Sequence, residues 1–313
     1  MNKRVVLFLM VNLMFMLTIS IIVRLTSIGV NSFAPDIGVY TYIAIISLVV
    51  GFGGAFFSLL ISRWMAKKAY GVKVIDPNLV SDPVQQRLVK KVHQFASDAG
   101  LAVMPEVGIY QDSSPNAFAT GPSKRKSLVA VSSGLLESMT DSEVEGVLAH
   151  EIAHIANDDM VTMTLLQGVV NSFVFFLAYV ITMFLFRGSK NGGRLKFFLV
   201  RMCLEMVLGI LGAMVVYWFS RHREYRADTG GAQLCGHSKM MAALKKLQLI
   251  YDKPLKSLEQ QRSRYDFSRS SDGSIACMKI SSEKKMGSQL AKLFSTHPPM
   301  ADRIARLSES SGY

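Results

Sequence analysis

The chain has 313 residues, of which 50% are hydrophobic, and it carries a formal net charge of +12. Its three cysteines, Cys203, Cys235 and Cys277, are odd in number and widely separated, which excludes a secreted module held by disulfides. The high apolar content excludes disorder for most of the chain. The sequence contains no nucleic-acid-binding motif, so the positive charge indicates an anionic membrane surface and not nucleic acid as the partner.

Four apolar stretches are about as long as the ~20 residues of helix that cross the hydrocarbon core of a bilayer. They lie at Val5–Val23, Val39–Ile61, Met160–Phe186 and Phe197–Phe219. We therefore predict a mostly α-helical integral membrane protein with four transmembrane helices in two hairpins and a cytosolic α+β domain. The expected parts are an N-terminal hairpin at 1–63, the first part of the cytosolic domain at 64–159, a second hairpin at 160–219 and the second part of the domain at 220–313.

Basic residues flank the first hairpin at both ends. Lys3 and Arg4 precede it, and Arg63, Lys67 and Lys68 follow it. Because short cytoplasmic flanks carry an excess of Lys and Arg, both ends are expected to face the cytoplasm. No convincing cleavage site follows the first stretch, which is interpreted as a retained signal anchor that keeps the chain in the lipid bilayer.

The turn of the second hairpin is basic, with Arg187, Lys190, Arg194 and Lys196. Full crossing would place these residues outside, against the positive-inside tendency, so the earlier spans would have to fix the topology. Alternatively, the hairpin dips into the membrane from the cytoplasmic side; full crossing is the preferred interpretation. In the fourth stretch, Arg201 and Glu205 are spaced i,i+4, which favours a structural ion pair over a functional one.

Between the hairpins the pattern becomes that of a soluble domain. Apolar residues at helical spacing predict a helix over Ser81–Gly100. Short apolar runs bounded by turns predict strands at Val107–Tyr110, Ala117–Thr120 and Leu128–Val131. Thr140 and Glu143 fit a capping box, so a helix is expected from there to about Asn157. Farther along, the polar segment Lys253–Ser274 predicts a loop.

The motif His150-Glu151-x-x-His154 lies within the capped helix. Imidazoles at i and i+4 project from one helix face and can hold a single zinc ion. Glu151 is adjacent to the first ligand and can reach a metal-bound water as a catalytic base. The alternative, two incidental surface histidines, is disfavoured by the helical context of the motif.

A catalytic zinc site needs three protein ligands and one open position, and the third candidate ligand is Glu224. No third histidine follows the motif closely, which argues against the metzincin pattern. A membrane hairpin returns the chain to the side that it left, so a residue after the fourth stretch can come back to the metal. His222 is the rival ligand, although it lies about 200° from Glu224 around a helix.

Asp228 lies four residues after Glu224, on the same helix face. Its carboxylate could accept a hydrogen bond from the outer ring nitrogen of a ligating histidine and fix its tautomer. The alternative for Asp228 is an ordinary surface salt bridge. Two further candidates are His297, as a donor to the developing oxyanion or a structural residue, and Asn116, as a substrate contact beside a strand or a turn residue.

Several motifs together resemble the HtpX family of bacterial inner-membrane zinc proteases, which is related to the CAAX prenyl endopeptidases. They are the HExxH helix, the downstream Glu-x-x-x-Asp, Asn-Ala-Phe-Ala-Thr-Gly at 116–121, Ser-Arg-His-Arg-Glu at 220–224 and Thr-His-Pro-Pro at 296–299. The resemblance implies a gluzincin-like cytosolic protease domain, with His150, His154 and Glu224 holding one zinc ion and Glu151 as the base. It also implies ATP-independent cleavage of damaged or misfolded membrane proteins, in quality control and the stress response.

Three other functions compete with this interpretation. An intramembrane protease with its motif inside the bilayer is rejected, because Asp141, Glu143 and Glu145 precede the motif and acidic residues follow it, which would be very costly in hydrocarbon. A CAAX-type prenyl-protein endopeptidase shares the metal site. A non-catalytic zinc-binding membrane scaffold would need a fourth protein ligand, and no nearby cysteine offers one.

Overall fold

The computed structural model describes residues 37–186, 193–266 and 297–310 of the chain, with side chains at 42–186, 193–251 and 297–309. The chain divides into two compact units, which are treated separately. Of the described residues, those up to Ser62 and those within Met160–Val216 form the apolar unit, and those within Arg63–Asp159 and from Tyr217 onward form the mixed unit. The predicted first transmembrane stretch, Val5–Val23, lies outside the described residues.

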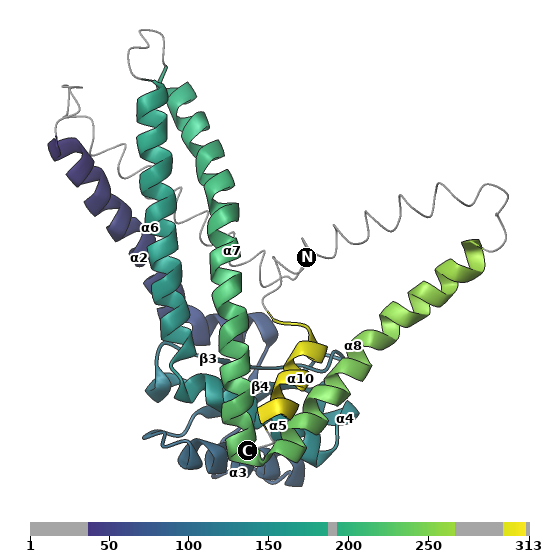
Figure 1. The fold of residues 1–313 in the computed structure, drawn as a ribbon. Helices are drawn as coiled ribbons and strands as arrows, with labels where there is room; N and C mark the ends of the chain where they lie inside the picture. The colour runs from purple at the N-terminus through teal and green to yellow at the C-terminus, as the bar shows by residue number, and fades with distance from the viewer. Residues whose placement is uncertain (1–36, 187–192, 267–296, 311–313) are drawn as a thin grey trace. The chain divides into compact units, whose positions relative to one another are not determined.

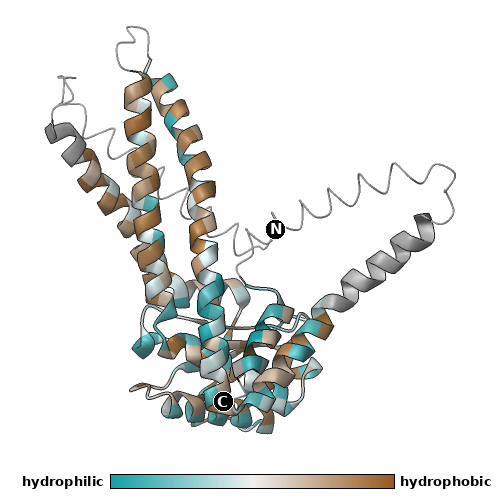
Figure 2. Cartoon of the chain, viewed as in Figure 1, coloured by the Kyte–Doolittle hydropathy of each residue, from teal (hydrophilic) through white to brown (hydrophobic). Residues whose placement is uncertain are grey.

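Three helices supply the described apolar segments: α2 (Ile37–Tyr70), α6 (Asp159–Leu185) and α7 (Arg194–Cys235). Among the described residues, these three are long and apolar enough to cross a membrane. The hydropathy colouring shows the long apolar stretches of α6 and α7, and α7 turning hydrophilic along its length (Figure 2). The predicted stretches at 39–61, 160–186 and 197–219 therefore correspond to helices.

The apolar unit packs through small residues and one buried ion pair. A side chain on Gly51 of α2 would place its Cβ 2.2 Å from the Ser172 hydroxyl of α6, so glycine is what lets these helices approach. On α7, Arg201 Nε lies 3.1 Å from Glu205 Oε1. The guanidinium also lies 5.3 Å from the centre of the Phe175 ring, which is the environment of a structural pair.

The mixed unit contains a four-stranded sheet in the order β1-β2-β4-β3. Its strands are β1 (Lys73–Val74), β2 (Glu106–Tyr110), β3 (Ala117–Thr120) and β4 (Leu128–Ser132). β2 and β4 run parallel, with Val107 opposite Val129, and the other pairs are antiparallel. Every residue of β4 is buried, whereas β3 is an edge strand. The three predicted strands are confirmed; the short β1 was not predicted.

The helix that carries the HExxH motif is α5 (Asp141–Ala156). Its predicted capping box is confirmed: the Glu143 carboxylate accepts from the Thr140 amide at 2.8 Å, and the Thr140 hydroxyl accepts from the Glu143 amide. The predicted helix before the strands is also confirmed, as α3 (Pro83–Asp98). The short α4 (Ser133–Ser138) links β4 to α5. Figure 1 shows these helices gathered around the sheet.

The helical placement expected for His222, Glu224 and Asp228 is observed, because α7 continues from the fourth apolar stretch without a break to Cys235. One feature of the C-terminal part differs from the sequence-based expectation. The predicted loop at 253–274 is wrong as far as residue 266, because α8 spans His237–Asp266. Residues 253–266 are polar, but they include two each of Lys, Leu, Gln and Arg, which are good helix formers, so polarity alone does not indicate a loop. Residues 267–274 lie outside the described residues.

The last described helix, α10 (Met300–Ser310), packs against α8 (Figure 1). Leu307 is buried in one apolar cluster with Met240 and Leu244 of α8. The same cluster includes Ala232 of α7. The C-terminal helix is thus part of the core of the mixed unit.

The capping box predicts a measurable stability effect. Replacing Thr140 with Ala removes the acceptor for the Glu143 amide and should lower the free energy of unfolding by about 1 kcal/mol. Thermal unfolding of the purified protein in detergent measures this loss. Ser142→Ala, an exposed neighbour in the same turn, is the control and should have little effect. Equal losses in both variants would contradict a capping role for Thr140.

Candidate metal centre

Two buried imidazoles face each other on α5. His150 and His154 are one helical turn apart, and their Nε2 atoms lie 3.1 Å from one another. Their i,i+4 spacing places both rings on the same face of the helix, as the sequence predicted. The capped N-terminus of α5 and its packing against neighbouring helices hold this face in place.

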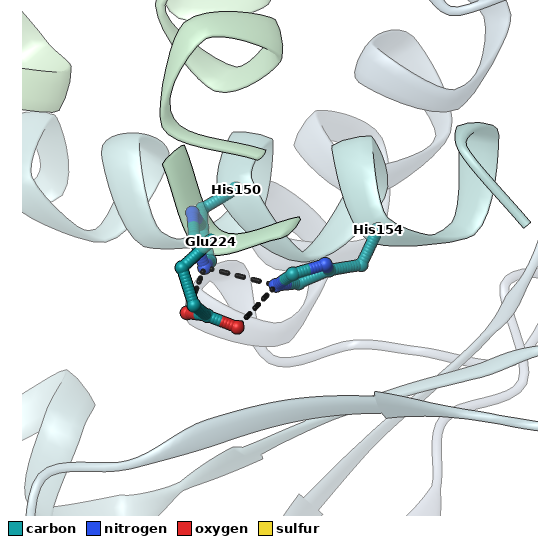
Figure 3. A group of neighbouring side chains, drawn as sticks. All are labelled: His150, His154 and Glu224. Atoms are coloured by element: carbon teal, nitrogen blue, oxygen red, sulfur yellow. Dashed lines mark hydrogen bonds and ion pairs between the residues drawn. The ribbon is translucent and has the colours of Figure 1, made fainter. Parts of the chain in front are cut away.

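The third member of the group is Glu224 of α7, whose side chain is 0% exposed. Its Oε2 lies 3.5 Å from His150 Nε2, and its Oε1 lies 3.4 Å from His154 Nε2 (Figure 3). α7 can approach α5 this closely because Gly231 lies against it: a Cβ there would be 3.1 Å from the His150 amide nitrogen. The sequence-predicted ligand set is therefore brought together in space.

These three residues fit a metal ion. One ligand atom from each residue lies within 4.8 Å of the other two. A tetrahedral ion with bonds of about 2.0 Å separates its ligands by about 3.3 Å. The two Nε2 atoms are 3.1 Å apart, and each lies 3.4 to 3.5 Å from one of the two carboxylate oxygens of Glu224, which is close to that spacing. In addition, Glu224 Oε1 is buried and has no hydrogen-bond partner among the described residues. A buried carboxylate oxygen without a donor is costly, and a cation would satisfy it.

The electrostatic environment keeps Glu224 ionised. Burial alone acts to raise the pKa of Glu224, but the nearby imidazoles of His150, His154 and His297 outweigh burial and hold the pKa far below its usual range. An ionised carboxylate beside two imidazoles is a donor set typical of zinc and related transition metals.

His150 is oriented by a buried aspartate and arginine. Its Nδ1 lies 3.0 Å from Asp228 Oδ1, on the side of the ring away from Glu224. Arg303 of α10 donates to both oxygens of Asp228, at 2.5 and 2.8 Å, and is only 5% exposed. Burial acts to raise the pKa of Asp228, but these hydrogen bonds from Arg303 and His150 keep the pKa below its usual value.

His154 has an equivalent pair of neighbours. Its Nδ1 lies 2.6 Å from Asp159 Oδ2, and Arg226 of α7 donates to the other oxygen of Asp159. Burial acts to lower the pKa of His154, but hydrogen bonds to Asp159 and Glu224 outweigh it and raise the pKa to about 9. The carboxyl of Asp159 is itself kept ionised, because the hydrogen bonds from His154 and Arg226 overcome its burial and lower its pKa.

Glu151, the second residue of the motif, contacts the edge of the sheet. Its Oε2 accepts a hydrogen bond from the Ala119 amide of β3 at 2.8 Å. The helix that carries the imidazoles and the strand that borders the site are therefore joined through this carboxylate. The contact holds Glu151 next to His150 without placing it in the ligand group.

The remaining predicted site residues occupy different positions. His297 is close to the group: its Nδ1 lies 2.8 Å from Glu224 Oε2, and its side chain is 59% exposed. Asn116 lies before β3, where its side-chain amide donates to the Tyr110 hydroxyl at 2.8 Å. His222, the rival ligand, lies outside the group: its ring is 4.4 Å from the Trp218 ring, and its Nδ1 is 3.0 Å from the Trp218 carbonyl oxygen.

Sequence reasoning missed three residues around the centre: Asp159, Arg226 and Arg303. Asp159 follows the second imidazole by five positions, and the break between α5 and α6 turns it back toward that ring. Arg303 is six positions beyond His297, in a helix whose docking on α7 and α8 is set by tertiary packing. Of these three residues, only Asp159 could have been inferred from the sequence, because it is an acidic residue just after the helix that carries the HExxH motif.

The raised pKa of His154 predicts how metal binding depends on pH. A metal ion needs an unprotonated Nε2, so binding below about pH 9 must release a proton. Affinity for Zn²⁺ should weaken about tenfold per pH unit between pH 8 and pH 6.5. Competition against a chelator measures this slope, and His222→Ala should leave it unchanged. An affinity that does not vary with pH would contradict the assignment of His154.

The raised pKa of His154 also determines how the free energy of unfolding of the metal-free protein depends on pH. Because the folded-state pKa of His154 lies above its ordinary value of 6.5, its contribution to folding is fully present below pH 6.5. That contribution is lost as the pH rises through about 9. Thermal unfolding of chelator-treated protein across this range is the corresponding measurement.

Comparisons with known proteins identify relatives along nearly the whole chain. The chain is 46% identical to the protease HtpX homolog of Bacillus pumilus over 318 residues, covering 98% of this chain and 99% of that protein. The Bacillus subtilis homolog is also 46% identical, over 313 residues, with the same coverage. Protease HtpX of Idiomarina loihiensis is 43% identical over 311 residues, again covering 98% and 99%. The resemblance inferred from the motifs is thereby confirmed.

A solved structure shares the fold. The crystal structure of S. mikatae Ste24p matches with a TM-score of 0.56 and 18% identity, covering 86% of this chain and 58% of that one. The family model for peptidase family M48 matches residues 83–311, which include all the ligand candidates. With this match and with relatives aligned along nearly its whole length, the chain belongs to peptidase family M48 and is a membrane-bound metalloprotease.

Proposed function

We propose that this protein is a zinc metalloendopeptidase that hydrolyses peptide bonds at the centre formed by His150, His154 and Glu224. The observation that carries the proposal is the buried ligand group with its unsatisfied carboxylate oxygen on Glu224. Two imidazoles and one carboxylate leave a fourth position for water or substrate, as in catalytic zinc sites. One zinc ion per chain is expected.

The catalytic chemistry is assigned to Glu151. When bound, zinc would supply a Lewis acid that polarises the peptide carbonyl and activates water at neutral pH. Glu151 takes the proton of the attacking water and delivers it to the nitrogen of the leaving amine. Before substrate arrives, the Ala119 amide holds the Glu151 carboxylate in place at 2.8 Å.

Two further residues are assigned to the substrate. His297 has an exposed ring beside Glu224, which supports a role as hydrogen-bond donor to the oxyanion of the transition state. Asn116 precedes the edge strand β3, along which an extended substrate backbone can pair. Its hydrogen bond to Tyr110 holds this end of the strand in position.

The proposed substrates are damaged or misfolded membrane proteins, cleaved without ATP at a cytoplasm-facing site of the bacterial inner membrane. The apolar helices support attachment to the lipid bilayer. The cytoplasmic orientation is supported by the basic residues Arg63, Lys67 and Lys68 at the end of α2. A role in membrane protein quality control and the stress response follows from that substrate class; nucleic acid is not an expected partner.

Substitution of the base tests the proposal directly. Glu151→Gln should lower the cleavage rate of an unfolded model membrane protein by about 10²- to 10⁴-fold, because the amide cannot take a proton. Zinc content should remain that of the wild type, since Glu151 is outside the ligand group. Removal of zinc by a chelator should abolish wild-type cleavage, and zinc should restore it. Glu137→Gln, an exposed glutamate on α4, is the matched control.

The same assay separates the alternatives. An active, zinc-loaded Glu151→Gln variant would remove Glu151 from the role of base. Cleavage of a prenylated CAAX peptide in preference to unfolded membrane proteins would favour the prenyl-protein endopeptidase. A zinc-loaded wild type without any peptidase activity would favour the non-catalytic scaffold.

A further inference from the structure

Each imidazole of the metal centre contacts a carboxylate that is itself held by an arginine. On one side, His150 contacts Asp228, which is paired with Arg303. On the other side, His154 contacts Asp159, which is paired with Arg226. The two arginines differ in burial: the side chain of Arg303 is 5% exposed, whereas that of Arg226 is 54% exposed.

The backbone between α5 and α6 places Asp159 beneath His154. α5 ends at Ala156, and Asp158 adopts a φ of +54°, in the left-handed region. Lys124 fixes this turn by donating to the Ala156 carbonyl oxygen at 2.7 Å and by pairing with Asp158 at 2.8 Å. The consecutive aspartates therefore differ sharply in environment: the side chain of Asp158 is 46% exposed and that of Asp159 is 1% exposed.

We propose that Asp159 is a positioning residue for metal binding: together with Arg226, it holds His154 in the tautomer that leaves Nε2 free for the metal. The proposal rests on the zinc site proposed above. It assigns a function to the first residue of α6, a position at which an acidic side chain would otherwise only favour the start of a helix.

The direction of the hydrogen bonds supports this assignment. An ionised carboxylate only accepts, so the hydrogen in the 2.6 Å contact belongs to His154 Nδ1. With hydrogen on Nδ1, the nitrogen that can offer a lone pair is Nε2, which faces Glu224 and His150. Arg226 occupies the other oxygen of Asp159 and so limits rotation of the carboxylate. Such carboxylate–histidine contacts orient metal ligands in proteins generally.

Asparagine at position 159 would reverse this hydrogen-bond pattern. Arg226 carries only donors, so it would retain the amide oxygen of the asparagine. The amide NH₂ would then face His154 Nδ1 and require that nitrogen to be an acceptor. The hydrogen would move to Nε2, where it blocks metal binding. Removal of the Arg226 side chain would let the amide turn over and present its oxygen to His154 again.

A double-mutant experiment on the full-length protein in detergent tests the role of Asp159, because a second substitution should partly restore zinc binding. Zinc affinity is measured by competition with a chromogenic chelator. Asp159→Asn should weaken zinc binding about 10- to 100-fold. Arg226→Ala alone should have a small effect on zinc affinity, because the carboxylate of Asp159 still offers only acceptor oxygens to His154 Nδ1. Arg226→Ala combined with Asp159→Asn should bind zinc more tightly than Asp159→Asn alone.

The matched control is Asp98→Asn. It removes the same charge from an exposed position at the end of α3 and leaves the turn between α5 and α6 unchanged. Zinc affinity of this variant should stay within about twofold of the wild type. Thermal unfolding of the metal-free variants detects any general loss of folding, and nitrogen-15 NMR of the histidines reports the tautomer of His154.

The outcomes separate the two proposals. Wild-type zinc binding with unchanged affinity in Asp159→Asn would overturn the positioning role and leave the zinc site intact. Equal losses in Asp159→Asn and in the double variant would overturn the tautomer mechanism. A wild type that takes up no zinc would overturn the zinc site and, with it, the role of Asp159.

Discussion

The structure depends on one wholly buried carboxylate meeting two imidazoles. A charged group without solvent is strongly destabilising unless other groups compensate it. The negative charge of Glu224 is stabilised by three nearby histidines. Its Oε1 atom nevertheless has no hydrogen-bond donor among the described residues. Packing α7 against α5 therefore buries a negative charge that a bound metal ion would neutralise.

Each element of the mixed unit that surrounds Glu224 contributes to that compensation. α5 supplies both imidazoles, α7 supplies Glu224 and Asp228, and α10 supplies Arg303. Because Arg303 pairs with Asp228 and Asp228 contacts His150, the C-terminal helix is linked to the metal centre through two contacts. Residues far apart in the sequence are therefore required together for one site. The edge strand β3 adds the Ala119 amide that holds Glu151.

Local features were predicted well from the sequence. The capping box at Thr140, the helix that follows it and the three strands were correct, because each depends on neighbouring residues and on short-range periodicity. The loop assigned to 253–274 was wrong as far as residue 266, since polarity does not distinguish a solvated helix from an unstructured segment.

The sequence by itself determined the donor types, the i,i+4 spacing of the two imidazoles and the position of Glu151 between them, because a helix converts spacing directly into a shared face. It also indicated Glu224 and Asp228 as candidates. Only the tertiary structure decided that Glu224, and not His222, reaches the imidazoles, and that Asp159 and Arg303 lie behind them. These contacts depend on how helices cross and on which buried charges are paired, and neither is encoded in local periodicity.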